Sequence, residues 1–233
     1  MTKANLQIAV VLFGESDATR LKRESAKYIH PDSQRKSGKS QARNVAHYAG
    51  RCALGFLLHR VVPGGRIGRN DAWGYLELFD SKSQLLPNWR GNISHTEGIA
   101  VAVIGPNNVG IDVERVERSA EKVIRRVSSQ QERDAAAEKK KRDPSFPGNI
   151  ALWSAKEAAA KAIGIGMNFG LQRFQIQLTS KPPFEVKTDL RGPLRVENLA
   201  VRFEIYDDFL ISICSEEGDL VSVPEIVKIC PLS

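Results

Sequence analysis

Two short stretches constrain the fold most, because each places charged side chains at a spacing that one kind of element brings together. The first is residues 153–161, which read Trp-Ser-Ala-Lys-Glu-Ala-Ala-Ala-Lys. In a helix, side chains four residues apart share a face, so Trp153, Glu157 and Lys161 would stand above one another. We therefore predict a helix that presents a carboxylate and an amine on one side.

Two less specific interpretations of this stretch remain open. Ser154 and Glu157 have the spacing of a capping box, in which both side chains bond orphan amides at a helix start. Pro147 and Gly148 offer an earlier start, which we favour and which leaves Ser154 inside the helix. Glu157 and Lys161 also form the i,i+4 pair common on helix surfaces, so their spacing alone does not define a site.

The second stretch is residues 109–114, which read Val-Gly-Ile-Asp-Val-Glu and alternate like a strand. Strand geometry would put Asp112 and Glu114 on the face that holds Gly110, with roots about 7 Å apart. Like charges so close raise each other's pKa unless a cation lies between them. With Glu157 they form a set of three carboxylates that suits Mg²⁺, which takes oxygen ligands and leaves positions for water and phosphate. The alternative is the solvent face of an edge strand.

Residues 110–114 followed by 153–161 resemble the paired signature of the 4′-phosphopantetheinyl transferases. Gly91–His95 resembles the third motif of that family, and the three occur in the family's order. The resemblance covers roughly residues 40–175. The length of 233 residues is similar to that of the Sfp type, in which one chain holds two related halves.

The resemblance implies an α+β fold with two similar α/β halves related by a pseudo-twofold axis. Each half would pack a helix on a small antiparallel sheet, and each half of the sequence does offer a helix followed by paired strands. We place the boundary near Gly105–Asn108. Residues 1–106 would then form the N-terminal half with the coenzyme A nucleotide contacts, and residues 107–233 the C-terminal half with the metal site and the catalytic helix.

The implied reaction is transfer of 4′-phosphopantetheine from coenzyme A to a serine of an apo carrier protein, with release of 3′,5′-ADP. Mg²⁺, or Mn²⁺ in its place, would be held by Asp112, Glu114 and Glu157, and Asp112 would also contact the coenzyme. Glu157 would be the base for the serine, and Lys161 would stabilise the leaving phosphate. Whether Glu157 is base, metal ligand or both stays open, since both roles use the same lone pairs.

The coenzyme A contacts of the first half fall on a long helix and on the third motif. Residues 41–60 have the clearest helical period, with an apolar stripe of Ala42, Val45, Ala46, Ala49, Cys52, Ala53, Phe56 and Leu57. Arg51 is the better positional match for the family's nucleotide-binding arginine, and Arg43 is the second. The resemblance makes Ser94 and His95 phosphate donors. The polar loop Pro31–Ser40 would be a solvated loop or a phosphate-binding one, and which of Arg35, Lys36, Lys39 and Arg43 holds the 3′-phosphate stays open.

The remaining pattern predicts strands at Leu6–Phe13, Trp73–Phe79, Arg173–Leu178 and Phe184–Lys187, and a helix at Ser16–Ile29. Val201–Tyr206 and Phe209–Cys214 would pair through a turn at Asp207-Asp208. Ile99–Ile104 and Val109–Glu114 read as a hairpin closed by Gly105–Asn108. Residues 117–142 read as charged helix, either a solvated face or a docking surface for an acidic partner.

Net charge indicates which binding partners suit the chain, and the number of cysteines indicates its cellular compartment. The net charge is +7, with 42% hydrophobic and 26% charged residues, so an acidic carrier protein and coenzyme A suit the chain. We expect no nucleic acid or membrane partner and a monomer. Three widely spaced cysteines, Cys52, Cys214 and Cys230, indicate a reducing cytoplasm.

Two other function classes share part of this residue pattern. A metal-dependent nuclease also combines acids with a lysine, but such sites commonly place the lysine two residues after an acid on one strand. Here Lys161 follows Glu157 by four residues on a helix. A carrier-binding module without catalysis would be favoured if one of the three carboxylates were missing, and all three are present. The pathway of the carrier, whether fatty acid, polyketide or nonribosomal peptide, and the tolerance for acyl-coenzyme A are not encoded in any motif.

Overall fold

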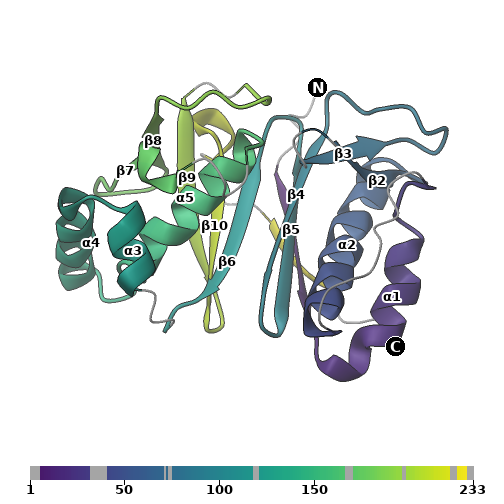
Figure 1. The fold of residues 1–233 in the computed structure, drawn as a ribbon, viewed down its shortest axis with the longest axis horizontal. Coiled ribbons are helices and arrows are strands. Elements are labelled where there is room, and N and C mark those ends of the chain that lie inside the picture. Colours follow the sequence, from purple (N-terminus) through teal and green to yellow (C-terminus); the bar gives the residue numbers. More distant parts are fainter. Residues whose placement is uncertain are drawn as a thin grey trace. The chain divides into compact units, whose positions relative to one another are not determined.

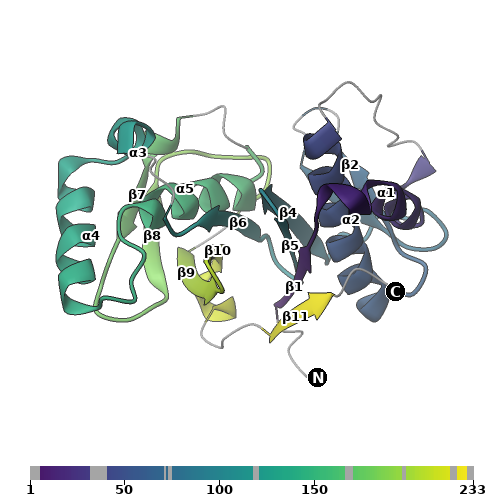
Figure 2. The ribbon, with the colours of Figure 1, turned by 90° about the horizontal axis from the view of Figure 1, so that it is seen from below.

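The computed structural model describes residues 6–31, 41–70, 72, 75–117, 121–165, 170–195, 198–220 and 225–229. It is an α+β protein that divides into two compact units (Figures 1 and 2). The first unit is Met1–Asn107 with Pro224–Ser233, and the second is Asn108–Val223. No helix within these described ranges is long and apolar enough to cross a membrane.

The first unit is built around a four-stranded sheet and the long helix α2. Its helices are α1 (Ala18–Ala26), which follows a 3-10 turn at Glu15–Asp17, and α2 (Gln41–Val61). Its strands are β1 (Gln7–Leu12), β2 (Arg66–Arg69), β3 (Leu76–Phe79), β4 (Arg90–Thr96), β5 (Ile99–Gly105) and β11 (Glu225–Ile229). The sheet order is β11-β1-β5-β4, and β2 and β3 form a separate pair.

Helix α2 packs against β1, β4 and β5 with the predicted apolar stripe. Six of its eight members are buried, whereas Ala42 is exposed and Phe56 half-buried. Cys52 is among the buried ones, and burial raises the pKa of its thiol to about 12. Burial also raises the pKa of Cys214, while Cys230 lies outside the described residues. Cys52 is therefore a core residue, as predicted.

The second unit is a five-stranded antiparallel sheet with helix α5 packed on β6, β9 and β10. Its helices are α3 (Glu121–Val127), α4 (Gln130–Arg142) and α5 (Ile150–Ala162), with 3-10 turns at Leu171–Arg173 and Glu217–Asp219. Its strands are β6 (Gly110–Arg115), β7 (Phe174–Gln177), β8 (Phe184–Thr188), β9 (Leu199–Tyr206) and β10 (Phe209–Glu216). The sheet order is β6-β10-β9-β8-β7.

The predicted hairpin between Ile99–Ile104 and Val109–Glu114 is wrong. Strand β5 pairs with β1 on one edge and with β4 on the other, so it has no edge left for β6. Strand β6 instead pairs with β10 in the other sheet. Two consecutive apolar runs with a turn between them look like a hairpin, but here the turn is where the chain leaves one unit for the other.

The end of the chain also departs from the predicted division at residue 107. Strand β11 pairs in parallel with β1, from Gln7↔Glu225 to Val11↔Ile229, and so belongs to the first unit. The sheet of that unit is therefore mixed, and only the sheet of the second unit is antiparallel as predicted. The pseudo-twofold relation between the halves stays a prediction.

Three smaller differences concern element bounds. The charged segment 117–142 forms two helices, α3 and α4, because Ser129 caps the second one and breaks the run. The strand predicted at Trp73–Phe79 is β3, which begins at Leu76, and Trp73 lies outside the described residues. The predicted pairing of β9 with β10 through Asp207 is confirmed.

Candidate active site

The site is formed where strand β6 lies against helix α5. Gly110 makes this approach possible, because a Cβ at that position would lie 1.9 Å from the carbonyl oxygen of Ala158. Ala155, Ala158 and Ala159 on α5 are fully buried, so the helix presents small side chains to the sheet. Gly110 thus leaves room for the backbone of the helix on the strand face that also holds Asp112 and Glu114.

Asp112 lies at the centre of the site and is only 2% exposed. Lys161 Nζ donates to its Oδ1 at 2.8 Å and to the carbonyl oxygen of Ile111 at 3.0 Å. Ser154 Oγ donates to its Oδ2 at 2.9 Å. Both oxygens of Asp112 are therefore engaged by α5, and the alternative of a solvent-facing edge strand is wrong for this residue.

Glu114 and Trp153 form the second contact between the strand and the helix. Trp153 Nε1 donates to Oε1 of Glu114 at 2.8 Å, and the glutamate is 5% exposed. The i,i+4 pattern places Trp153 on the functional face, but it does not show that the indole would bind a carboxylate. Ser154 is a second residue whose role the sequence did not indicate. Helix α5 begins at Ile150, so Ser154 lies inside it, as favoured above.

Glu157 completes the group of carboxylates and is 7% exposed. Burial, and then the charge of Asp112, raise the pKa of Glu157 to about 8. Lys161 opposes this shift, and its Nζ lies 3.9 Å from Oε2 of the glutamate, farther than from Asp112. Glu157 and Lys161 are therefore not the solvated surface pair that the spacing also allowed.

Asp112, Glu114 and Glu157 offer the oxygen ligands that Mg²⁺ prefers. Lys161 alone lies beside these three buried carboxylates, so their negative charge exceeds the positive charge next to them. Their arrangement is not that of a ligand set, since no three His, Cys, Asp or Glu side chains within the described ranges lie close enough to hold one ion. Both oxygens of Asp112 already accept protein hydrogen bonds. Each oxygen keeps a second lone pair, so Asp112 can still contribute to a metal site while it holds Lys161 and Ser154.

A buried ion pair on the opposite side of α5 fixes this helix in the unit. Lys156 is fully buried, its Nζ lies 2.8 Å from Oε1 of Glu132, and it also donates to the carbonyl oxygen of Phe174. Glu132 accepts from the amides of Ser129 and Ile176 as well. Burial lowers the pKa of Lys156, and Glu132 opposes that shift. One carboxylate thus joins α4, α5 and β7.

We expect Lys156→Met to destabilise the protein by about 3–5 kcal/mol, because it leaves Glu132 buried without its cation. Urea unfolding measures this loss. The double variant Lys156→Met with Glu132→Gln removes the stranded charge and should recover part of it. Equal stability of the wild type and Lys156→Met would show that the pair does not hold α5.

Asp112 and Lys161, two of the residues predicted to contact coenzyme A, belong to the site described above in the second unit. The others, Arg43, Arg51, Ser94 and His95, lie in the first unit on α2 and β4, which pack together. Arg51 is 9% exposed and Ser94 7% exposed, whereas Arg43 and His95 are exposed. Ser94 and His95 are neighbours on a strand, so their side chains point to opposite faces. Arg35, Lys36 and Lys39 lie outside the described residues.

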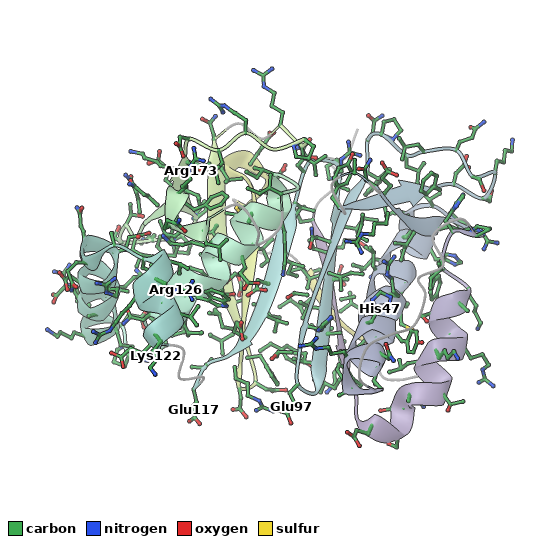
Figure 3. All side chains as sticks on the ribbon, viewed as in Figure 1. His47, Glu97, Glu117, Lys122, Arg126 and Arg173 are labelled. Carbon is green, nitrogen blue, oxygen red and sulfur yellow. The ribbon has the colours of Figure 1, made fainter. Side chains whose placement is uncertain are left out.

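The packing of β4 on α2 indicates that His95 lies nearer to Arg43 than to Arg51. Leu54 lies against Gly91, and Ile93 lies against Gly50, so strand and helix run in opposite directions. Two strand residues and one helix turn cover similar distances, about 6 Å. The next step along β4 therefore brings His95 toward the turn of α2 that precedes Gly50, on the side of Arg43. Figure 3 labels His47 in this part of α2.

Fold and site together define an α+β protein whose second unit holds a buried group of carboxylates beside a lysine. Residues 108–214 match the 4′-phosphopantetheinyl transferase superfamily. The predicted resemblance to that superfamily is thus confirmed for the segment that contains β6 and α5.

One curated relative is the 4′-phosphopantetheinyl transferase gsp of Aneurinibacillus migulanus, 27% identical over 124 residues. The match covers 53% of this chain and 50% of the relative, so the chain spans about half the length of the curated relative it matches. Among solved structures, the Helicobacter pylori holo-[acyl-carrier-protein] synthase in complex with coenzyme A is 17% identical, with a TM-score of 0.35 over 46% of this chain and 97% of that one. The Thermotoga maritima synthase is 24% identical, with a TM-score of 0.34 over 47% and 63%.

Proposed function

We propose that the protein transfers 4′-phosphopantetheine from coenzyme A to a serine hydroxyl of an apo carrier protein, with release of 3′,5′-ADP. The observation that carries the proposal is the contact of β6 with α5, which gathers Asp112, Glu114, Glu157 and Lys161 inside the segment matched to the superfamily. Acids and a cation held on two rigid elements suit the displacement of a phosphoryl group, which depends on positioning and charge.

Each residue has a role in this proposal that follows from its position. Asp112, Glu114 and Glu157 would hold Mg²⁺, which supplies charge neutralisation for the diphosphate when bound. Lys161 would move from Asp112 to the phosphate that leaves, where its ammonium group stabilises the new charge. Glu157 would take the proton of the attacking serine, directly or through a water. Trp153 orients Glu114, and Ser154 orients Asp112.

The direct test is incubation of the full chain with coenzyme A, Mg²⁺ and a panel of apo carrier proteins, followed by intact-mass measurement. We expect at least one carrier to gain a single phosphopantetheine group, and a Ser→Ala carrier to gain none. The panel should include fatty-acid, polyketide and peptide-synthetase carriers. An established transferase run on the same panel shows that the carriers are competent, so an unmodified panel with this chain would contradict the proposal.

We expect Arg51→Ala and His95→Ala to weaken coenzyme A binding more than they slow the chemical step, because phosphate contacts act in the ground and transition states alike. Calorimetry measures the affinity. Arg60→Ala, an exposed arginine on the same helix, is the matched control and should bind normally. Melting temperatures separate a folding defect at Arg51, which is buried, from lost contacts. Unchanged affinity in both variants would remove these residues from the coenzyme site.

We expect reversal of Arg125 and Arg126 to Glu to slow carrier association about tenfold at low ionic strength, since charges at an interface steer encounter. Both arginines are exposed on α3, where Figure 3 labels Arg126 and Lys122. Turnover with saturating carrier should change little. The control reverses Lys141 and Arg142, which lie at the far end of α4. A salt dependence identical to that of the wild type would mean that α3 is only a solvated face.

A further inference from the structure

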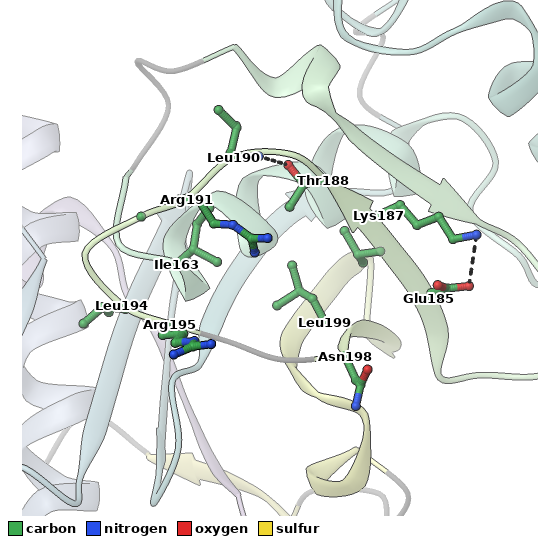
Figure 4. A pocket seen from close by; sticks show the side chains of 12 residues that line it. Ile163, Glu185, Lys187, Thr188, Leu190, Arg191, Leu194, Arg195, Asn198 and Leu199 are labelled. Atoms are coloured by element: carbon green, nitrogen blue, oxygen red, sulfur yellow. Dashed lines mark hydrogen bonds and ion pairs between the residues drawn. The ribbon is translucent and has the colours of Figure 1, made fainter.

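The second unit contains a pocket that the proposed reaction does not use. It has a volume of about 810 Å³ and is shown in Figure 4. Its walls come from the end of α5, from β8, from the start of β9 and from the loop between these strands. None of the residues proposed for transfer lines it.

The pocket exists because β8 and β9 separate. The two strands pair only at Phe184↔Val201 and Glu185↔Ala200. Beyond that point β8 continues to Thr188, paired with β7 on its other edge. The described loop residues that line the opening form one wall of the pocket: Leu190, Arg191, Gly192, Leu194, Arg195 and Asn198.

Three contacts anchor that wall. Arg173 binds Asp189 with two hydrogen bonds, of 2.9 and 2.6 Å. Asn108 Nδ2 donates to the carbonyl oxygen of Arg195 at 2.6 Å. Between them Gly192 lies so close to α5 that a Cβ would be 1.9 Å from the carbonyl oxygen of Ile163. The hydrogen bond of Asn108 and the close packing of Gly192 on α5 favour a preformed wall, which lowers the entropy cost of binding, whereas the exposed Arg173–Asp189 pair adds little.

The lining combines aliphatic side chains with an excess of positive charge. The aliphatic members are Ile163, Val186, Leu190, Leu194 and Leu199. The cations are Lys187, Arg191 and Arg195, whereas Glu185 is the one acid among the lining residues and lies 3.8 Å from Lys187. Figure 4 shows Arg191 and Arg195 on the loop side and Lys187 on the strand side of the hollow. The volume lies in the range of small-molecule sites, about 300–1,000 Å³.

We propose that this pocket binds a small amphipathic anion, a molecule with a carboxylate or phosphate head and an aliphatic body. The guanidinium groups of Arg191 and Arg195 receive the head, because paired N–H donors match the oxygens of either anion. The aliphatic walls receive the body, whose burial is favourable. The site is independent of the transfer reaction and holds whether or not the protein modifies a carrier.

The test uses the full chain with four probes: octanoate, octyl phosphate, 1-octanol and inorganic phosphate. Methyl NMR of the isoleucine and leucine residues locates binding, and calorimetry measures it. We expect octanoate, octyl phosphate or both to bind and to shift the methyl signals of Ile163, Leu190, Leu194 and Leu199. Which of the two binds more tightly identifies the head. Inorganic phosphate has the head without the body, and 1-octanol has the body without the charge. Both should bind at least about tenfold more weakly, since a charged contact or a buried chain contributes that much.

A matched pair of variants tests the charge. Arg191→Ala with Arg195→Ala should weaken binding of the preferred anion about tenfold or more, because charge-assisted hydrogen bonds are lost. Arg60→Ala with Arg142→Ala removes the same charge from exposed positions outside the pocket and should bind as the wild type does. Three results would each overturn the proposal: 1-octanol binding as tightly as octanoate and octyl phosphate, the pocket variant binding normally, or anions binding without shifts of the four methyl groups.

Discussion

Glu157→Gln is expected to lower transfer by about 10²-fold or more while the melting temperature stays at or above that of the wild type. The amide keeps the shape of the side chain but cannot accept the serine proton and is a poorer metal ligand. Burial and the charge of Asp112 raise the pKa of Glu157 to about 8, so the ionised side chain costs stability that the amide does not. Lys161→Ala should reduce transfer similarly.

Turnover and thermal unfolding of the same preparations make this test specific. Glu138→Gln changes an exposed glutamate on α4 and serves as the control, with normal transfer expected. If Glu157 and Lys161 had only a structural role, their variants would show a changed melting temperature and normal transfer. A Glu157→Gln protein that loads a carrier at more than about a tenth of the wild-type rate would remove the assigned base, given the loss expected for one.

Asp112→Ala and Glu114→Ala are expected to abolish transfer that depends on Mg²⁺ and to leave a folded protein. Loss of Asp112 is expected to disturb the rest of the site more, because it also frees Lys161 and Ser154 from their hydrogen bonds. Loss of Glu114 frees only the indole of Trp153. Both carboxylates are buried beside further acids, so their removal relieves charge repulsion and offsets part of the packing lost.

Titration of transfer with Mg²⁺ checks this prediction, with circular dichroism to verify the fold. Asp134→Ala, at an exposed position on α4, is the control. If either site variant turned over near the wild-type rate at the same Mg²⁺ concentration, that residue would not be a ligand. A variant restored by excess Mg²⁺ would still bind the ion through the remaining acids.

The core of the site follows from two local periodicities. Strand alternation places Asp112 and Glu114 on one face, and the helical i,i+4 step places Glu157 and Lys161 on one face. Both faces prove to be the ones in contact, since Lys161 reaches Asp112 and Trp153 reaches Glu114. The proposed roles of these residues remain predictions.

The strand pairing of β5, β6 and β11 and the burial of Lys156 could not be predicted from local patterns, because they depend on contacts between elements far apart in the sequence. The separation of β5 from β6 is set by β1 and β4, which occupy both edges of β5. The place of β11 beside β1 is a contact between the two ends of the chain, and no local pattern encodes it. Lys156 lies next to Glu157 in the sequence and looks like one more surface lysine, yet it is fully buried against Glu132.

The most direct measurement of the central claim is the balance of products. Apo carrier, coenzyme A, Mg²⁺ and the protein are incubated together, and 3′,5′-ADP is quantified alongside the carrier that has gained phosphopantetheine. Group transfer predicts equal amounts of the two at every time point, no release without carrier, and loss of both in Glu157→Gln. Release of 3′,5′-ADP without modification of a carrier that an established transferase does load would contradict it and would identify a hydrolase instead.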